Sequence, residues 1–521
     1  MTTALLLVPL LAPLGVAAAA ALLGWRALVA WSTVAAAGAI GVCGVLAGVA
    51  TADGRVLALG GTLRVDALSA VMLLVIGAVG LIATWAGVDY LDTELALGHT
   101  DARGARRYGL LVPLFLATMV LAVLASNLGI LWAAIEATTI VTAFLVGHRG
   151  GRGAVEATWK YVIICSVGIA LAYLGTVLVY YASQHAGTGV HGSLDWTVLV
   201  AHADQLDPGV MRIAVVLLVL GFGTKAGLVP MHGWLPDAHS QAPAPVSALM
   251  SGVLLSVALY ALLRYRVIAA AALDAGFLRT LLLVVALASV GFAASMMLAQ
   301  RDYKRLLAYS SIEHMGLMMI GVALGTPLAV AAVVLHILGH GLAKAVAFCG
   351  SGQILATEGT TQIADVRGLL ARRPAVAGAF ALAIAALLGL PPFSIFVSEL
   401  ALARATADAG LGWLLGVVLV LLLVVFVAVG AHVARMLFGT PGEPRRSEPH
   451  TSEADLAPAG PSPAGPAPAG PSTAGPSTAG PARRRAVAPL VAGLVVLAVI
   501  GVVAWPLDAL LEAAARIAGT S

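Results

Sequence analysis

A lysine inside an apolar segment is the residue of this sequence with the clearest chemical meaning. Lys225 follows the largely apolar run 217–224, and Pro230 comes five residues later. An ammonium group at bilayer depth costs at least about 3 kcal/mol. Proline removes a backbone donor, so we predict that the helix breaks there. An ionisable group beside an interrupted membrane helix is typical of ion pathways.

Glu136 is the predicted partner of this lysine. It lies in another apolar segment, 128–147. A buried carboxylate and Lys225 would each favour the charged form of the other. Opening and closing such a pair would make the lysine release and reload a proton, whereas a static ion pair between two helices is the alternative. Lys160 could also pair with Glu136, or it could extend to the membrane surface.

Three titratable side chains share one face of a later segment. His336, His340 and Lys344 follow one another at intervals of four residues, which places them about 6 Å apart along a helix. Histidine takes up and releases protons near neutral pH, so we interpret this face as a water-lined proton relay. Gly339 and Gly341 could loosen the helix. Two histidines at this spacing can also bind zinc, but the lysine and the lack of a nearby carboxylate disfavour a metal site. Structural packing of the three side chains is the other alternative.

Further ionisable residues extend the predicted relay. His314 and Glu313 lie inside the predicted tenth segment, and Glu399 follows a Pro-Pro pair in the twelfth. We expect them to continue a polar axis along the membrane midplane. For Glu313, a position at a helix end near Lys304 or Arg305 is the alternative.

Composition predicts an all-α polytopic membrane protein. Of 521 residues, 60% are hydrophobic and 10% are charged, with a mean hydropathy of +0.99. The three cysteines, Cys43, Cys165 and Cys349, are far apart and have no metal-ligand spacing. Nucleotide-binding glycine motifs and basic runs with aromatic residues are absent from the sequence. We expect no cofactor, no metal and no nucleic-acid partner.

The apolar segments predict about 14 membrane spans of about 20 residues each. The seventh and twelfth are interrupted, near Pro230 and at 389–393. An offset of five spans would arise from two inverted five-helix repeats. The predicted parts are spans 1–3 (1–107), the first repeat (108–265), the second repeat (266–438), a Pro/Ala/Gly-rich linker (439–485), and a last span with an amphipathic tail (486–521).

The distribution of basic residues predicts the orientation. No Lys or Arg precedes the first apolar run, which we expect to be a membrane helix rather than a cleaved signal. Most loop Lys and Arg residues fall on the side opposite the N-terminus, so both termini are predicted outside. The low-complexity linker is expected to be an extended spacer, with a partner-binding arm as the alternative.

Several motifs resemble one family of membrane proteins. They are PMHGWLPDAHSQAP (230–243) after Lys225, RDYKRLLAYSSI (301–312) and HGLAK (340–344). These runs resemble the antiporter-like subunits of respiratory complex I, Mrp cation/proton antiporters and membrane-bound hydrogenases. Within that family, IEHMG (312–316) and PPFSIFVSE (391–399) are most similar to component F of hydrogenase-4.

The resemblance implies 14 helices, broken seventh and twelfth helices, and defined roles for site residues. Glu136 and Lys225 would be the charge-coupling pair, Lys344 and the histidines the central axis, and Glu399 the carboxylate of the second channel. One departure is Ser256, which stands in the eighth span where complex I relatives often have lysine. The link between the two half-channels could use this hydroxyl with water, or His314.

These observations predict a proton-translocating subunit of a complex I-like oxidoreductase in a bacterial-type plasma membrane. It would have no redox centre of its own, and its partners would be other membrane and redox subunits, the lipid bilayer and protons, with sodium as a further candidate ion. The alternatives are a subunit of a Mrp-type sodium/proton antiporter, an ion-coupled subunit of an inorganic carbon uptake complex, and a purely structural membrane subunit.

Overall fold

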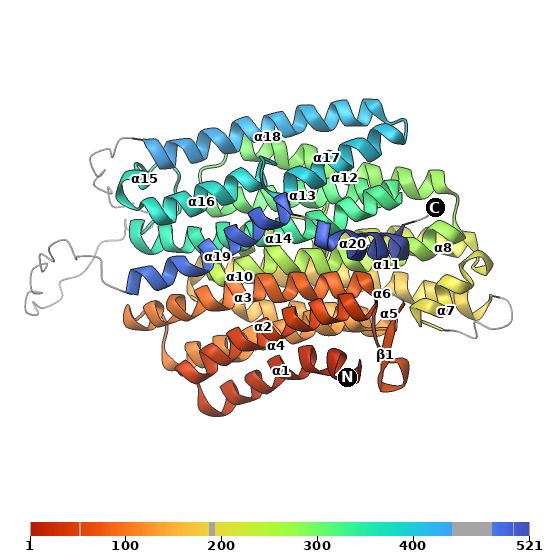
Figure 1. Ribbon diagram of the computed structural model, residues 1–521, viewed down its shortest axis with the longest axis horizontal. Helices are drawn as coiled ribbons and strands as arrows, with labels where there is room; N and C mark the ends of the chain where they lie inside the picture. Colours follow the sequence, from red (N-terminus) through yellow and green to blue (C-terminus); the bar gives the residue numbers. More distant parts are fainter. Residues whose placement is uncertain (1, 52–53, 187–192, 440–481, 504, 520–521) are drawn as a thin grey trace, which may run out of the picture.

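A computed structural model describes residues 2–51, 54–186, 193–439, 482–503 and 505–519, and they form a bundle of long helices (Figure 1). The helices are α1 (Thr2–Leu23), α2 (Ala27–Ala50), α3 (Ala67–Ala96), α4 (Ala102–Leu124), α5 (Leu128–Val146), α6 (Gly151–Gln184), α7 (Trp196–Ala201), α8 (Pro208–Ala226), α9 (Trp234–Gln241), α10 (Ala244–Leu249), α11 (Leu255–Ala272), α12 (Ala275–Leu298), α13 (Tyr303–Leu324), α14 (Pro327–Glu358), α15 (Leu369–Arg372), α16 (Pro374–Leu387), α17 (Ser394–Asp408), α18 (Gly412–Phe438), α19 (Ala482–Val502) and α20 (Trp505–Ala518). The remaining elements are the 3-10 turns η1 (Leu59–Gly61) and η2 (Ala203–Gln205), the π-helical turn η3 (Met250–Leu254), and the antiparallel pair β1 (Val56–Ala58) and β2 (Leu63–Val65).

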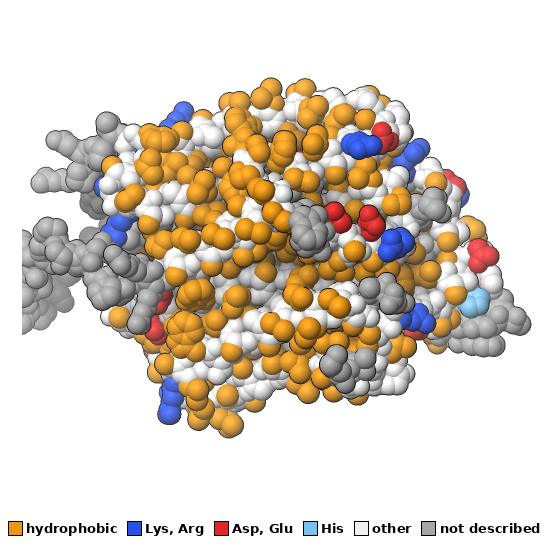
Figure 2. Space-filling view, in the orientation of Figure 1, with side chains coloured by type: hydrophobic (Ala, Val, Ile, Leu, Met, Phe, Trp, Pro, Cys, Tyr) orange, Lys and Arg blue, Asp and Glu red, His pale blue; other side chains and the backbone are white. Residues whose placement is uncertain are grey.

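The all-α membrane architecture is confirmed. Among the described residues, twelve helices are long and apolar enough to cross a membrane, and the bent pair α19/α20 would make thirteen. Helix α16 is apolar but shorter, and it occupies the first half of the predicted twelfth span. Apolar side chains cover the middle of the visible face, with most charged ones toward the two ends (Figure 2). The count of fourteen spans stays a prediction.

The predicted interruption beside Lys225 is present. Helix α8 ends at Ala226, and α9 begins only at Trp234. Gly227 adopts a left-handed conformation with φ +77°, which lets its amide and the next one bond back to carbonyls of the last turn of α8. The chain therefore leaves the helix axis within one turn of the lysine.

The second interruption has a similar construction. Helix α16 ends at Leu387, Gly389 has φ +63°, and α17 begins at Ser394. Both breaks contain a cis X-Pro bond, at Pro230 and at Pro392. The inverted-repeat relation and the domain boundaries drawn from it remain predictions.

The expectation that glycines loosen the histidine-bearing helix is wrong. Helix α14 runs unbroken through Gly339 and Gly341. A Cβ at Gly341 would stand 2.9 Å from the carbonyl oxygen of Gly252, so the glycine allows close approach of two backbones instead. Most of the predicted linker, 440–481, lies outside the described residues.

A buried ion pair fixes the β-hairpin to the helices. Asp66, the N-cap of α3, accepts a hydrogen bond from Arg264 Nη2 at 2.7 Å, and Arg64 lies 3.5 Å away. Burial alone would raise the pKa of Asp66, but the two guanidinium groups hold that pKa well below its usual range. These ion pairs thus connect the hairpin residue Arg64 to the start of α3 and to Arg264 of α11.

Candidate proton-transfer site

Lys225 is almost completely enclosed, with 1% of its surface exposed. Its Nζ donates hydrogen bonds to Thr139 Oγ1 and to the Tyr161 hydroxyl, each at 2.7 Å. The ammonium also lies 5.0 Å from the centre of the Tyr161 ring, where a cation–π attraction adds to the contact. Two hydroxyl groups and an aromatic ring therefore hold this lysine at the end of α8.

Glu136 reaches the lysine through a hydroxyl group. The Thr139 hydroxyl donates to Glu136 Oε2 at 3.2 Å while it accepts from Lys225. Both residues are described, and no ion pair within 4.0 Å joins Glu136 directly to Lys225. The structure thus brings the predicted pair together with Thr139 between the two charges.

The backbone groups released by the first break have polar partners. Trp234 Nε1 donates to the carbonyl oxygen of Thr224 at 2.8 Å, and the amide of Val229 donates to Ser289 Oγ at 3.0 Å. Buried backbone groups without partners are costly, so these contacts stabilise the interruption. Trp234 also packs edge-on against Tyr161 at 5.0 Å, which links the break to the lysine's hydroxyl partner.

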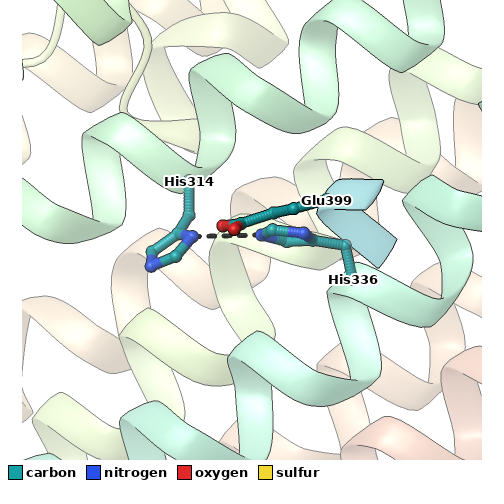
Figure 3. A group of neighbouring side chains, drawn as sticks. All are labelled: His314, His336 and Glu399. Carbon is teal, nitrogen blue, oxygen red and sulfur yellow. Dashed lines mark hydrogen bonds between the residues drawn. The ribbon is translucent and has the colours of Figure 1, made fainter. Parts of the chain in front are cut away.

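A second polar cluster joins α13, α14 and α17. His314 Nδ1 lies 3.0 Å from His336 Nε2, and His336 Nδ1 lies 2.9 Å from Ser398 Oγ. The Glu399 carboxylate extends toward the two rings (Figure 3), and one ligand atom from each of His314, His336 and Glu399 lies within 4.8 Å of the other two. Residues from three helices therefore share one polar site, in which the two histidines are buried and Glu399 is partly buried.

His340 and Lys344 continue the cluster along α14. The ring of His340 lies 5.1 Å from that of His314, and neither of its nitrogens has a hydrogen-bond partner among the described residues. Lys344 Nζ donates to the carbonyl oxygen of Leu307 at 2.7 Å and to Ser310 Oγ. All four predicted residues of the central axis are thus buried around the contact between α13 and α14.

Glycine makes room for the carboxylate at the second break. A Cβ at Gly389 would stand 2.1 Å from Glu399 Oε2, so only glycine lets the carboxylate lie against this backbone. Likewise, a Cβ at Gly339 would stand 2.6 Å from Ser394 Oγ. Helix α17 can therefore approach the histidines of α14 closely.

Two serines near the π-helical turn η3 differ in their hydrogen-bond partners. Ser251, in the π-helical turn η3, pairs with Ser311 at 2.7 Å. The Ser256 hydroxyl instead bonds to the carbonyl oxygen of Gly252 in its own helix at 3.3 Å. His239 is buried nearby on α9, and neither of its ring nitrogens has a hydrogen-bond partner among the described residues. Of these two serines, Ser251 bonds across to α13, the helix that carries His314, whereas the Ser256 hydroxyl bonds to a carbonyl four residues earlier.

The predicted contact between Lys160 and Glu136 is wrong. Lys160 Nζ instead lies 2.6 Å from Glu156 and 3.0 Å from Asp237. Asp237 also pairs with Arg305 at 3.0 Å. Lys160 is partly exposed, so it takes the alternative that the sequence left open, with a position toward the surface.

Glu313 does not lie at a helix end with basic neighbours. It is buried in the middle of α13, and its Oε2 lies 3.5 Å from His314 Nε2. Lys304 donates to the carbonyls of Ser240 and Ala242 instead. Glu313 therefore belongs to the histidine cluster.

Four hydroxyl groups of the site were not predicted: Thr139, Tyr161, Ser310 and Ser398. Thr139 stands three residues after Glu136, so helical spacing could have identified it. Ser398 is the neighbour of Glu399. Tyr161 and Ser310 meet their lysines across helix interfaces, and the sequence carries no signal for those contacts.

Comparison with known proteins places this arrangement in a family. Residues 125–426 match the family described as NADH:quinone oxidoreductase/Mrp antiporter, TM. The chain is 39% identical over 386 residues to the hydrogenase-4 component F homolog of Methylacidiphilum infernorum, covering 73% of this chain and 79% of that protein. It is 35% identical over 293 residues to NADH-quinone oxidoreductase subunit N of Desulforudis audaxviator, covering 56% of each.

The fold is also similar to a solved structure. A chain of the Mrp complex from Dietzia sp. DQ12-45-1b aligns with a TM-score of 0.80 at 24% identity, over 99% of this chain and 97% of that one. The family match over residues 125–426 spans both interrupted helices and every candidate site residue. The resemblance read from the motifs is confirmed, and this chain belongs to the NADH:quinone oxidoreductase/Mrp antiporter transmembrane family.

Proposed function

We propose that this chain is a proton-translocating membrane subunit of a complex I-like oxidoreductase, of the hydrogenase-4 or NADH-quinone oxidoreductase type. The observation that carries the proposal is the enclosed Lys225, which ends an interrupted helix and reaches Glu136 through one hydroxyl group. A structural tether would not need a cation at this depth. The similarity to a hydrogenase-4 component F homolog supports the choice of complex.

The first transfer step follows the direction of the hydrogen bonds. Lys225 donates to Thr139, and Thr139 donates to Glu136. One proton can therefore move from the ammonium to the threonine oxygen while the threonine proton moves to the carboxylate. The step leaves a neutral amine and a neutral acid, and the reverse step reloads the lysine. A change in the partner subunits that favours one charge state over the other would drive it.

The second cluster supplies the later steps. In the proposed order, a proton from the Lys344 side reaches His340 and then His314, His336 and Glu399. The contact of His314 Nδ1 with His336 Nε2 gives one direct transfer. Imidazole accepts a proton at one nitrogen and releases it from the other, which suits residues in the middle of such a path.

The proposal assigns redox chemistry to partner subunits and none to this chain. Its partners are other membrane and redox subunits within a lipid bilayer. The membrane would be a bacterial-type plasma membrane, with both termini outside, as the loop charges suggest. A Mrp-type sodium/proton antiporter is the second candidate, because the same family description covers both kinds of complex.

Purification from the native membrane, with identification of the accompanying subunits, separates the two candidates. Recovery of nickel-iron or iron–sulfur subunits supports the oxidoreductase, and recovery of small membrane subunits alone supports the antiporter. In sealed vesicles of the intact complex, Lys225→Ala should abolish proton translocation. Lys160→Ala, which removes a partly exposed lysine, should leave it near the wild-type rate. Unchanged translocation in Lys225→Ala would overturn the proposal.

A further inference from the structure

We propose that His314, His336 and Glu399 form a binding site for a divalent transition-metal cation of the zinc class, and that a bound cation stops proton transfer at the second break. The first statement rests on the geometry of the cluster alone. The second also rests on the proposed proton route. From the sequence, a metal at His336 and His340 was disfavoured by Lys344 on the same helix face and by the lack of a nearby carboxylate. The structure brings in Glu399 from another segment.

The distances suit a tetrahedral ion. Zinc–nitrogen bonds of about 2.0–2.1 Å place two ligand atoms about 3.3 Å apart. His314 Nδ1 and His336 Nε2 are separated by 3.0 Å, and all three ligand atoms lie within 4.8 Å of one another. Figure 3 shows the carboxylate beside the line that joins the two rings. Small rotations of the side chains would complete three ligands and leave a fourth position open.

The outer nitrogens of both rings have suitable neighbours. Metal-binding histidines usually donate their second N–H to a carboxylate or another oxygen. His336 Nδ1 lies 2.9 Å from Ser398 Oγ, and His314 Nε2 lies 3.5 Å from Glu313 Oε2. Binding requires the His314 proton to stand on Nε2, facing Glu313. Neither ring loses a proton, and Glu399 binds as a carboxylate.

The charges of the cluster favour a dication. Glu399 and Glu313 together can balance two positive charges in a site where an unbalanced ion would be costly. Lys344 is turned toward Leu307 and Ser310 of α13, outside the ligand set. Two imidazole nitrogens select zinc-class ions over magnesium, calcium and sodium, which prefer oxygen.

A bound cation would use the lone pairs that proton transfer needs. His336 Nε2 could no longer accept the proton of His314, and the Glu399 carboxylate would be occupied. We therefore expect saturating Zn²⁺ to lower proton translocation by at least about tenfold, because general acid–base groups of this kind account for 10²–10⁴-fold effects.

Metal analysis of the purified complex tests the site. The full-length protein with its native subunits is incubated with zinc chloride and excess Mg²⁺, freed of unbound ion, and analysed by mass spectrometry. His336→Gln and Glu399→Gln should each lose one Zn²⁺ relative to the wild type. His340→Gln, which changes a neighbouring ring outside the ligand set, and His432→Gln on α18 should retain it. X-ray absorption should show two imidazoles and one carboxylate at about 2.0–2.1 Å.

Ser398→Ala provides a milder variant in case the ligand substitutions disturb folding. Loss of a hydrogen bond to a metal-bound histidine should weaken Zn²⁺ binding about 10–100-fold. Equal zinc content in wild type, His336→Gln and Glu399→Gln would overturn the site. If zinc is lost from these variants as expected but does not slow the wild-type pump, the site stands, and the route through His336 is contradicted.

Discussion

The two helix breaks share a construction but carry opposite charges. Each follows a left-handed glycine, Gly227 or Gly389, and contains a proline. Lys225 stands in the last turn of the half-helix before its break, where the negative end of the helix dipole favours a cation. Glu399 follows its break and stands in the second turn of α17, where it lies against the backbone of Gly389. The same kind of helix break can therefore position a proton donor, Lys225, at one site and a proton acceptor, Glu399, at the other.

The surroundings of the two charges differ more than the breaks do. Lys225 is enclosed by side-chain hydroxyls from α5 and α6. Glu399 lies against the backbone of Gly389 and beside two imidazoles. Hydroxyl groups give the lysine fixed hydrogen-bond directions, whereas the carboxylate meets groups that themselves take up protons. The first break thus suits a lysine that changes its charge state, and the second suits the release of a proton from the histidine cluster to a carboxylate.

Substituting alanine for Gly227 and for Gly389 should distinguish the two breaks, and it should give the largest difference in proton-translocation rate. Both substitutions place Cβ in a left-handed conformation, which costs about 1–2 kcal/mol of stability. In Gly389→Ala the new Cβ meets Glu399 Oε2 at 2.1 Å and displaces the carboxylate. In Gly227→Ala it meets Leu235 Cδ1 at 2.3 Å, the end of a flexible side chain.

We expect Gly389→Ala to lower proton translocation about 100-fold or more, because it removes a transfer group from its position. Gly227→Ala should show a similar loss of thermal stability and a smaller loss of rate. Equal rates in the two variants would show that the position of Glu399 does not matter.

Removing the Thr139 hydroxyl, which lies between Lys225 and Glu136, should have an intermediate effect on the rate of proton translocation. Thr139→Val keeps the shape of the side chain and leaves a buried donor without its acceptor, which costs about 1–3 kcal/mol. Translocation should slow by about tenfold or more. Thr138→Val is the matched control, because among the described residues the Thr138 hydroxyl bonds only to the carbonyl oxygen of Ile135 in its own helix. If both valine variants behave alike, the bridge does not carry the proton.

The smallest effect on the rate of proton translocation is expected for substitution of Ser256. Ser256 bonds to its own helix, so Ser256→Ala should change the translocation rate less than about twofold. Ser251→Ala should slow it more, because it removes the partner of Ser311 on α13, the helix that carries His314. A larger loss in Ser256→Ala than in Ser251→Ala would reverse this assignment.

The sequence predicted those parts of the structure that depend on local chemistry. Proline and glycine placed both breaks, and the four-residue spacing placed His336, His340 and Lys344 on one face. Contacts between side chains of different helices were harder to predict from the sequence. His314 comes from α13 and meets both histidines of α14, and Thr139 separates the predicted ion pair. Lys160 turned to Asp237 instead of Glu136. These outcomes depend on how helices cross, which the periodicity of one chain does not encode.

The most direct test asks whether the two breaks serve one proton path. Proton translocation per turnover is measured in vesicles of the intact complex carrying Lys225→Ala, Glu399→Gln or both. A single path predicts that each substitution alone abolishes translocation and that the double variant is no worse. If each single variant keeps about half of the wild-type translocation and only the double variant loses it, the breaks belong to separate paths, and the account is wrong.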